Sequence, residues 1–251
     1  MRLLSVFIAM LPIFTSCGKE EPLTDSEKAM ESIRISNHPR ARAAELRVGP
    51  GLLRDLAKLD LHLGDPVFIR AFKEEKQLEI FIMRRETGKY ELFRTYPIAA
   101  TSGVLGPKLA EGDGQVPEGF YFVNAKAMNP DSTYHLSFNI GFPNQYDRAH
   151  DRTGSNIMIH GNRVSIGCLA MTDEKIEEIF TLCDTALRNG QDFFRVHIFP
   201  FKMTAGRLAR ESANTHADFW ENLKTGYDFF EKQKVPPNCV VKGAVYQFRA
   251  D

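Results

Sequence analysis

The chain has 251 residues, of which 43% are hydrophobic and 25% charged, enough to bury a substantial core in one large domain or two small ones. Lysine and arginine number 32, as do aspartate and glutamate, so the formal net charge is zero. No global positive field attracts nucleic acid or an anionic membrane surface, and a nucleic-acid-binding protein is therefore disfavoured. The four cysteines are too few for a disulfide scaffold, and no Cys-x-x-Cys pair indicates a structural zinc site.

The first 17 residues have the features of an export signal. Arg2 precedes an apolar stretch of 12 residues from Leu3 to Phe14, and small or polar residues follow up to Cys17. Such a stretch is shorter than the ~20 residues that span a bilayer. Because Phe-Thr-Ser-Cys resembles the site at which bacterial lipoproteins are cut and acylated, we expect residues 1–17 to be a lipoprotein-type signal peptide with lipidation at Cys17. Cleavage with release of a soluble protein and an uncleaved anchor are the alternatives.

Residues 18–49 combine charge with no clean apolar stripe, which predicts a tether followed by a poorly ordered helical region. A regular pattern begins at residue 50. In chain order we expect a helix over 52–63, strands over 67–72, 78–83, 90–99, 119–125, 134–140 and 156–159, a helix over 173–187, a strand over 193–199, a helix over 204–232 and a final strand over 239–248. The first three strands should pair antiparallel, because their connections are too short for crossover helices. A glycine-rich loop over 101–117, with two prolines, is of the kind that shapes a binding site.

The candidate for chemistry is the segment from His160 to Cys168. His160 ends an apolar strand, and Cys168 precedes Thr172, the expected N-cap of the next helix, by four residues. The positive end of that helix is expected to stabilise a thiolate, which otherwise forms only near a pH of ~8.5. Gly161 and Gly167 allow a sharp turn and a close approach to substrate, so amides near Gly167 and Cys168 could stabilise an oxyanion. A neighbouring imidazole could take the thiol proton and return it to a leaving amine.

The spacing alone also suits a packed thiol beside a hydrogen-bonded histidine. A metal site is disfavoured because one histidine and one cysteine lack further ligands, and we expect neither a metal nor a cofactor. A thiol redox protein would need a resolving cysteine, whereas Cys183 and Cys239 are expected to be core residues. His135 and Asn139 share one face of their strand and could line a cleft or pack against a loop.

The segment resembles the L,D-transpeptidase catalytic domain, also called the YkuD domain, whose signature is His-Gly followed by Ser/Thr-His-Gly-Cys. His160-Gly161 and Ser165-Ile166-Gly167-Cys168 match this signature except at Ile166. Residues 64–70, 117–121, 134–144, 168–172 and 219–224 further resemble a murein-associated branch of the family with a shorter motif. The resemblance implies an α+β fold with a mostly antiparallel sheet and flanking helices. We expect this domain to occupy residues 50–251.

The resemblance also implies a role for each residue of the motif. Cys168 would be the nucleophile and His160 the general base and acid, with the backbone carbonyl of Gly161 orienting the imidazole. The oxyanion and substrate region would comprise Ser165, Ile166 and Gly167. Because most of the family has a histidine at the position of Ile166, acceptor choice or rate is expected to differ.

The implied activity is acyl transfer on peptidoglycan stem peptides in cell-wall cross-linking or remodelling. Cys168 would attack the carbonyl on the L-centre of meso-diaminopimelate and form a thioester. An amine acceptor would give transpeptidation and water would give hydrolysis; the branch also implies cleavage of the bond between diaminopimelate and the lysine of a murein-bound lipoprotein. A non-catalytic murein-binding envelope lipoprotein is the alternative from another class. The expected location is the periplasm or cell envelope, with membrane contact only through a lipid anchor.

Overall fold

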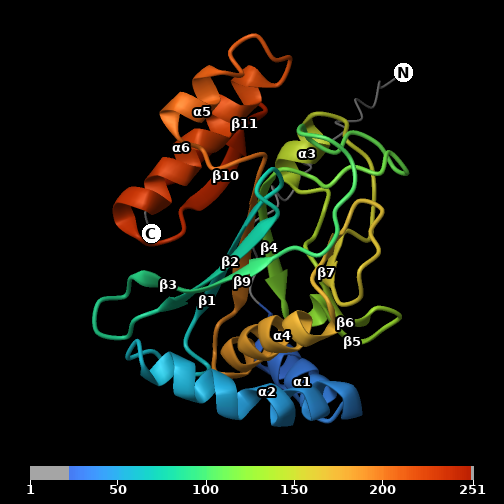
Figure 1. Ribbon diagram of the computed structural model, residues 1–251, viewed down its shortest axis with the longest axis vertical. Coiled ribbons are helices and arrows are strands. Elements are labelled where there is room, and N and C mark those ends of the chain that lie inside the picture. The colour runs from blue at the N-terminus through green and yellow to red at the C-terminus, as the bar shows by residue number, and fades with distance from the viewer. Residues whose placement is uncertain (1–22, 250–251) are drawn as a thin grey trace, which may run out of the picture.

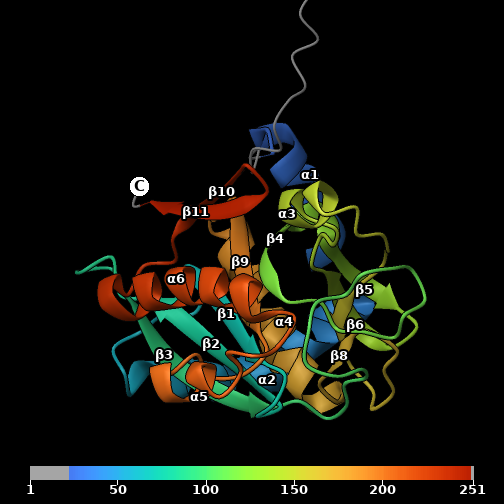
Figure 2. The ribbon, with the colours of Figure 1, turned by 90° about the horizontal axis from the view of Figure 1, so that it is seen from above.

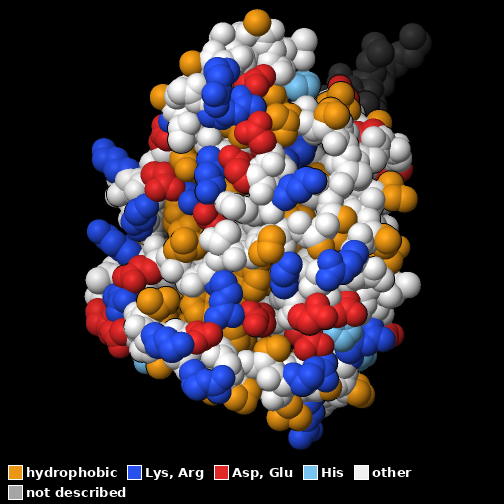
Figure 3. Space-filling view, viewed as in Figure 1, with side chains coloured by type: hydrophobic (Ala, Val, Ile, Leu, Met, Phe, Trp, Pro, Cys, Tyr) orange, Lys and Arg blue, Asp and Glu red, His pale blue; other side chains and the backbone are white. Residues whose placement is uncertain are grey.

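The computed structural model describes residues 23–249, which form an α+β fold (Figure 1). The expected signal peptide and Cys17 lie outside the described residues. Over residues 23–249, no helix combines the length and apolar character needed to cross a membrane. Basic and acidic side chains are intermixed on the face shown in Figure 3, in keeping with the balanced composition.

The main sheet confirms the antiparallel start predicted from the short connections. Its strand order is β3 (Tyr90–Pro97), β2 (Gln77–Met83), β1 (Val67–Phe72), β9 (Phe193–Phe199) and β4 (Gly119–Asn124). Neighbouring strands pair antiparallel except β1 and β9, which are parallel. Every residue of β1 is buried because helices cover both faces of the sheet. Ile69 contributes to the main core and Phe68 packs against Phe230 on the opposite face.

A smaller second sheet carries the candidate residues for chemistry. Its strands are β5 (Met128–Ser132), β6 (His135–Asn139), β7 (Met158–His160) and β8 (Leu169–Ala170), in that order. The pairs β5–β6 and β6–β7 are antiparallel, whereas β7 and β8 are parallel. The sequence did not predict β5 or β8, since β8 has only two residues and β5 contains polar residues and a proline in place of an apolar run.

The N-terminal segment differs most from expectation. The helical region expected before residue 50 is present, but its helices α1 (Asp25–Ser36) and α2 (Pro39–Ala57) are regular rather than poorly ordered. Thr24 and Glu27 form a capping box at the start of α1. Ile35 and Ala44 are fully buried in the main core, so small alanines supply part of the apolar stripe that larger residues usually supply. Of the helix predicted over 52–63, residues 52–57 form the end of α2, and residues 58–63 are a turn and loop.

The long helix α4 (Asp173–Arg188) confirms the prediction over 173–187. Its predicted apolar face is buried at Ile176, Ile179, Phe180, Cys183 and Leu187. Figure 1 shows α4 between the sheets and the two N-terminal helices. An ion pair between Arg47 on α2 and Glu177 on α4 joins the two helices at 2.5 Å.

Two predictions near the C-terminus were wrong in detail. The helix expected over 204–232 is split into α5 (Ala205–Ala209) and α6 (Ala217–Gln233). The side chain of Asn214 accepts a hydrogen bond from the backbone of His216, a local bond that competes with helix continuation. The final strand over 239–248 is a hairpin of β10 (Asn238–Lys242) and β11 (Val245–Arg249), because Gly243 and Ala244 both have positive φ and reverse the chain. The hairpin packs near the short helix α3 (Gln145–Ala149), where His150 bonds to the carbonyl of Ala244.

A buried ion pair fastens the 101–117 loop to the main sheet and α6. Lys73 Nζ lies 2.9 Å from Glu118 Oε1, and the two side chains are 5% and 0% exposed. The same ammonium donates to the carbonyls of Gly106 and Val116, while Trp220 Nε1 donates to Glu118 Oε2 at 2.7 Å. Each charge is therefore compensated by a partner and by further hydrogen bonds, as buried charges require.

We predict that Glu118→Gln lowers the free energy of unfolding by about 3 kcal/mol, because it leaves the Lys73 charge buried without its counterion. Urea denaturation monitored by the fluorescence of Trp220 measures the change. Glu86→Gln removes a carboxylate from an exposed turn and serves as the control, with an expected change below ~0.5 kcal/mol. Equal stability of Glu118→Gln and the control would contradict the assigned role of the pair.

Candidate active site

The register of two short parallel strands brings together the candidate nucleophile and base. Ile159 on β7 pairs with Leu169 on β8, so Met158 lies opposite Cys168 and the backbone N–H of Met158 donates to Cys168 Sγ at 3.4 Å. Side chains two residues apart on a strand share a face, which puts Met158 and His160 on the same side as Cys168. All three line a cavity of about 240 Å³, together with Asn129, Ser132, Thr133, Tyr134, Ser137 and Asn156.

The imidazole of His160 is held in one tautomer. Its Nδ1 lies 2.6 Å from the carbonyl oxygen of Gly161, which only accepts, so Nδ1 carries the proton and Nε2 is left as the acceptor. The ring of Tyr134 stacks on the imidazole with centroids 4.7 Å apart. Burial lowers the pKa of His160 below its ordinary 6.5 and outweighs the opposite effect of the Gly161 carbonyl. The imidazole is therefore neutral near pH 7 and ready to accept a proton.

Glycine is required next to this histidine by close packing. A Cβ at position 161 would lie 2.7 Å from the carbonyl oxygen of Tyr134 and 2.6 Å from Asp173 Oδ1. Asp173 Oδ1 is itself fixed by the backbone N–H of Asn162 at 2.7 Å. Any side chain at this position would displace either the turn that carries Tyr134 or the start of α4.

The turn that carries Tyr134 is anchored by the N-terminal helices. Arg40 on α2 donates to the backbone carbonyls of Ser132 and His135 at 2.7 and 2.6 Å. The ring of His135 bonds to Glu177 on α4 at 2.7 Å and is not among the residues that line the cavity. His135, which was considered as a cleft-lining residue, therefore does not line this cavity. Its neighbour Tyr134, which the sequence did not single out, lines the cavity instead.

The thiol of Cys168 is protonated in the resting protein. Burial raises its pKa above the ordinary 9.0, and the Met158 N–H and the charge of Lys108 oppose this only in part. The expected stabilisation by the helix N-terminus is not realised, because β8 separates Cys168 from α4 and Thr172 makes no side-chain capping bond. With a neutral thiol and a neutral imidazole lining one cavity, any attack by Cys168 would need a proton transfer to form the thiolate.

The two amides expected to bind an oxyanion already have hydroxyl partners. The N–H of Gly167 donates to Ser102 Oγ at 2.6 Å, and the N–H of Cys168 donates to Ser165 Oγ at 3.1 Å. Gly167 adopts φ of +90°, a conformation that favours glycine. An oxyanion at either amide would thus take the place of a serine hydroxyl. Ile166 is 84% exposed and does not line the cavity, so it offers no enclosed pocket for an acceptor.

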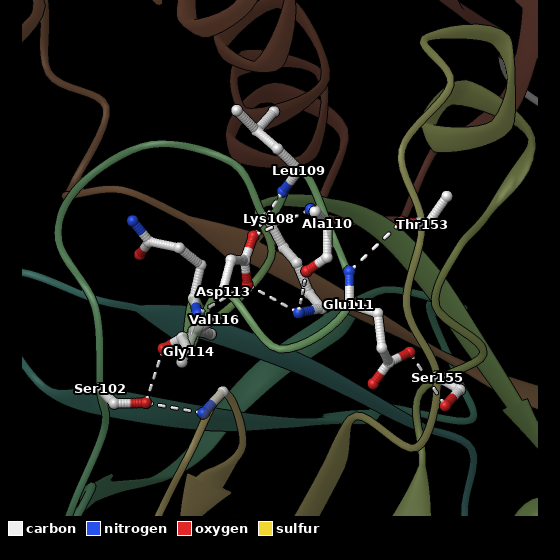
Figure 4. Close-up of polar contacts among 12 residues, drawn as sticks. Ser102, Lys108, Leu109, Ala110, Glu111, Asp113, Gly114, Val116, Thr153 and Ser155 are labelled. Atoms are coloured by element: carbon white, nitrogen blue, oxygen red, sulfur yellow. Dashed lines mark hydrogen bonds and ion pairs between the residues drawn. The ribbon is translucent and has the colours of Figure 1, made fainter.

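The 101–117 loop beside the nucleophile is braced by its own side chains (Figure 4). Asp113 accepts hydrogen bonds from the backbone N–H groups of Leu109 and Ala110, and Lys108 Nζ lies 2.7 Å from its other oxygen. Ser102 donates to the carbonyl of Gly114 while accepting from Gly167, so it joins the loop to the residue before Cys168. The composition of the loop indicated a site, but no sequence signal singled out Ser102 or Lys108.

This site lies within a region that matches a known catalytic family. Residues 67–198, which include His160 and Cys168, match the YkuD family model, the L,D-transpeptidase catalytic domain. The chain belongs to this family, and membership indicates a peptidoglycan-related enzyme with transpeptidase or a related activity.

The comparisons also identify individual relatives. The chain is 47% identical over 184 residues to the protein named "Putative L,D-transpeptidase YafK" in Escherichia coli (strain K12), with 73% of this chain and 74% of the relative covered. The protein of the same name from Escherichia coli O157:H7 matches equally. Among solved structures, the helical cell shape determining protein Pgp2 from Campylobacter jejuni is 18% identical with a TM-score of 0.42, covering 74% of this chain and 78% of that one. Bd1075 from Bdellovibrio bacteriovorus is 16% identical with a TM-score of 0.38, covering 71% and 78%.

We predict that the alkylation rate of Cys168 by iodoacetamide rises with pH about a midpoint above 9.0, since only the thiolate reacts and burial disfavours it. Mass spectrometry of the Cys168 peptide measures the rate separately from the other cysteines. In urea-unfolded protein the midpoint should fall toward the ordinary value. A folded-state midpoint below pH 8 would instead indicate a thiolate stabilised at rest.

We also predict that Gly161→Ala destabilises the fold by about 1–3 kcal/mol, because the added methyl group overlaps a backbone oxygen. Urea denaturation measures the change. Gly49→Ala on α2 is the matched control: nothing lies within 4 Å of its added Cβ, and alanine favours the helix by up to ~1 kcal/mol. Unchanged stability of Gly161→Ala would show that the neighbouring turn is free to move.

Proposed function

We propose that the protein is a cysteine-dependent acyltransferase that acts on peptidoglycan stem peptides. One observation carries the proposal: the β7–β8 register aligns Cys168 and His160 on one cavity, and the Gly161 carbonyl leaves His160 Nε2 as a proton acceptor. Membership in the L,D-transpeptidase family supplies the substrate class. A packed thiol with a hydrogen-bonded histidine would not require this shared cavity.

The first half-reaction forms a thioester. His160 Nε2 takes the Sγ proton as Cys168 Sγ bonds to the carbonyl carbon on the L-centre of meso-diaminopimelate, and the carbonyl oxygen becomes an oxyanion. When the tetrahedral intermediate collapses, the bond from carbon to the leaving nitrogen breaks, and the imidazolium returns the proton to that nitrogen. Because the pKa of His160 is lowered, it gives up this proton readily.

The second half-reaction determines the product. An amine acceptor loses a proton to His160 and attacks the thioester, which forms an amide and regenerates the thiol of Cys168. Water in place of the amine gives hydrolysis, which includes cleavage of a diaminopimelate–lysine bond to a murein-bound lipoprotein. We propose transfer as the primary activity and hydrolysis as the alternative. Ser165 and Gly167 belong to the oxyanion region in this proposal. The hydrogen bonds that the amides of Gly167 and Cys168 donate to serine hydroxyls would break when these amides bind the oxyanion.

We also propose that the protein works in the periplasm or cell envelope, anchored by a lipid on Cys17. The basis is the N-terminal sequence together with a substrate that lies outside the cytoplasmic membrane. We propose a murein-bound lipoprotein as a second partner. Only its lysine takes part in the reaction, either as the acceptor amine or as the leaving group.

We predict that Cys168→Ala and His160→Ala each lower activity by about a thousandfold or more, since nucleophile and base act as a unit. The measurement is mass spectrometry of sacculi incubated with the purified full chain. Cys239→Ala, outside the cavity, is the matched control and should retain activity.

The products decide between the alternatives. New diaminopimelate cross-links support transfer, and release of lipoprotein peptides without new links supports hydrolysis. Full activity of Cys168→Ala or of His160→Ala would contradict the mechanism. If the unmodified chain formed no product at all, the result would favour the alternative of a non-catalytic murein-binding protein.

A further inference from the structure

A larger groove continues the catalytic cavity along the same face of the second sheet. Ser137 and Asn139 share one face of β6, as Met158 and His160 share one face of β7. Ser137 and His160 line the catalytic cavity, whereas Asn139 lines an open groove of about 790 Å³. Met158 and Asn129 line both hollows. A chain bound along this sheet face could therefore pass from Cys168 into the groove without leaving the surface.

Elements far apart in the sequence form the walls of this groove. They are α1, the segment 124–129 and the segment 141–148, which includes part of α3. Both α1 and α3 lie toward the upper edge in Figure 2, but they lie near opposite ends of the molecule in Figure 1. Its polar lining consists of Glu31, Arg34, Asn124, Lys126, Asn129, Asn139 and Arg148. Three cationic side chains thus face one carboxylate, in a chain whose formal net charge is zero. The local excess of positive charge favours an anionic ligand.

Arg148 is the cation that remains uncompensated. Arg34 pairs with Glu31 at 2.5 Å, and Lys126 pairs with Glu27 at 2.5 Å. The exposed guanidinium of Arg148 donates to the carbonyl of Pro143, and within residues 23–249 no carboxylate forms an ion pair with it. Arg148 lines both the groove and a second hollow of about 280 Å³. A planar guanidinium with unused donors is suited to binding a carboxylate through two parallel hydrogen bonds.

We propose that the groove binds a carboxylate-bearing stretch of the peptide substrate and that Arg148 pairs with that carboxylate. The inference rests on the proposed function, because the reacting carbonyl at Cys168 fixes where the peptide enters the groove. The asparagine side chains that line the groove would form hydrogen bonds with backbone amide groups of the peptide, because a neutral amide can both donate and accept a hydrogen bond. Arg148 would then select for a free carboxylate over its amide at a site away from the reacting bond.

Binding is tested separately from catalysis in the full chain with Cys168→Ala. The probes are two synthetic stem peptides that differ only in whether the side carboxylates are free or amidated. Arg148→Gln should weaken binding of the free-acid peptide about tenfold, as measured by calorimetry, and leave the amidated peptide unchanged. Arg54→Gln removes an equally exposed charge from α2 and is the matched control, with neither affinity changed. Equal effects on both peptides, no effect on either, or failure of both to bind would overturn the inference.

Kinetic measurements on a chain that retains Cys168 distinguish a failure of the groove assignment from a failure of the proposed acyl transfer. Arg148→Gln should raise KM for the free-acid peptide about tenfold at unchanged kcat. An active unmodified chain with the same KM as Arg148→Gln would overturn the inference alone. An inactive unmodified chain that still discriminates the two peptides through Arg148 would overturn the proposed acyl transfer and leave the groove assignment standing.

Discussion

The parallel pairing of β7 with β8 is the constraint on which the site depends, since it alone brings His160 and Cys168 to one cavity. A two-residue strand is too short to hold its register unaided, and the surrounding bonds supply what it lacks. The N–H of Met171 donates to the carbonyl of His160 at 2.8 Å, and the N–H of Ala99 donates to the carbonyl of Ala170 at 2.8 Å. Ile159 and Leu169, the central pair, are fully buried. A slip by one residue would turn Cys168 to the opposite face, so core packing and catalysis are specified together.

Parts of the chain outside the catalytic family region complete the site. Arg40 on α2 holds the turn that stacks Tyr134 on His160, and α1 forms a wall of the groove beyond Met158. At the other end of the domain, Trp220 on α6 bonds to Glu118, which fixes the loop leading to Ser102. The N-terminal helices and α6 thus act on the same cavity from opposite sides. Residues 67–198 contain the candidate residues His160 and Cys168, while contacts from both flanking regions hold the segments around them.

The sequence predicted what short-range patterns encode. Strands such as Phe193–Phe199 are rich in aromatic and β-branched residues, and the paired His160-Gly161 and Gly167-Cys168 motifs predicted the candidate residues that the structure brings to one cavity. It predicted a helical region before residue 50 but not that α1 and α2 are regular and packed on the core, because their buried positions include small alanines between charged residues. Nor did it predict the partners of the amides at Gly167 and Cys168. Ser102 reaches Gly167 across 65 positions of sequence, and only the folded 101–117 loop brings them together.

The pKa directions at the cavity favour acyl transfer over redox chemistry at Cys168. A redox cysteine needs a thiolate at rest and a second thiol within reach. Burial instead raises the pKa of Cys168, and Cys183 lies in the main core with its own pKa raised well above the ordinary value. The proposed acyl transfer has no such need, because in it His160 would remove the proton as the bond to carbon forms. A protonated thiol is also the less oxidisable form, so the burial that raises the pKa of Cys168 protects it from oxidation and leaves its activation to the neighbouring base that the proposed mechanism assigns to His160.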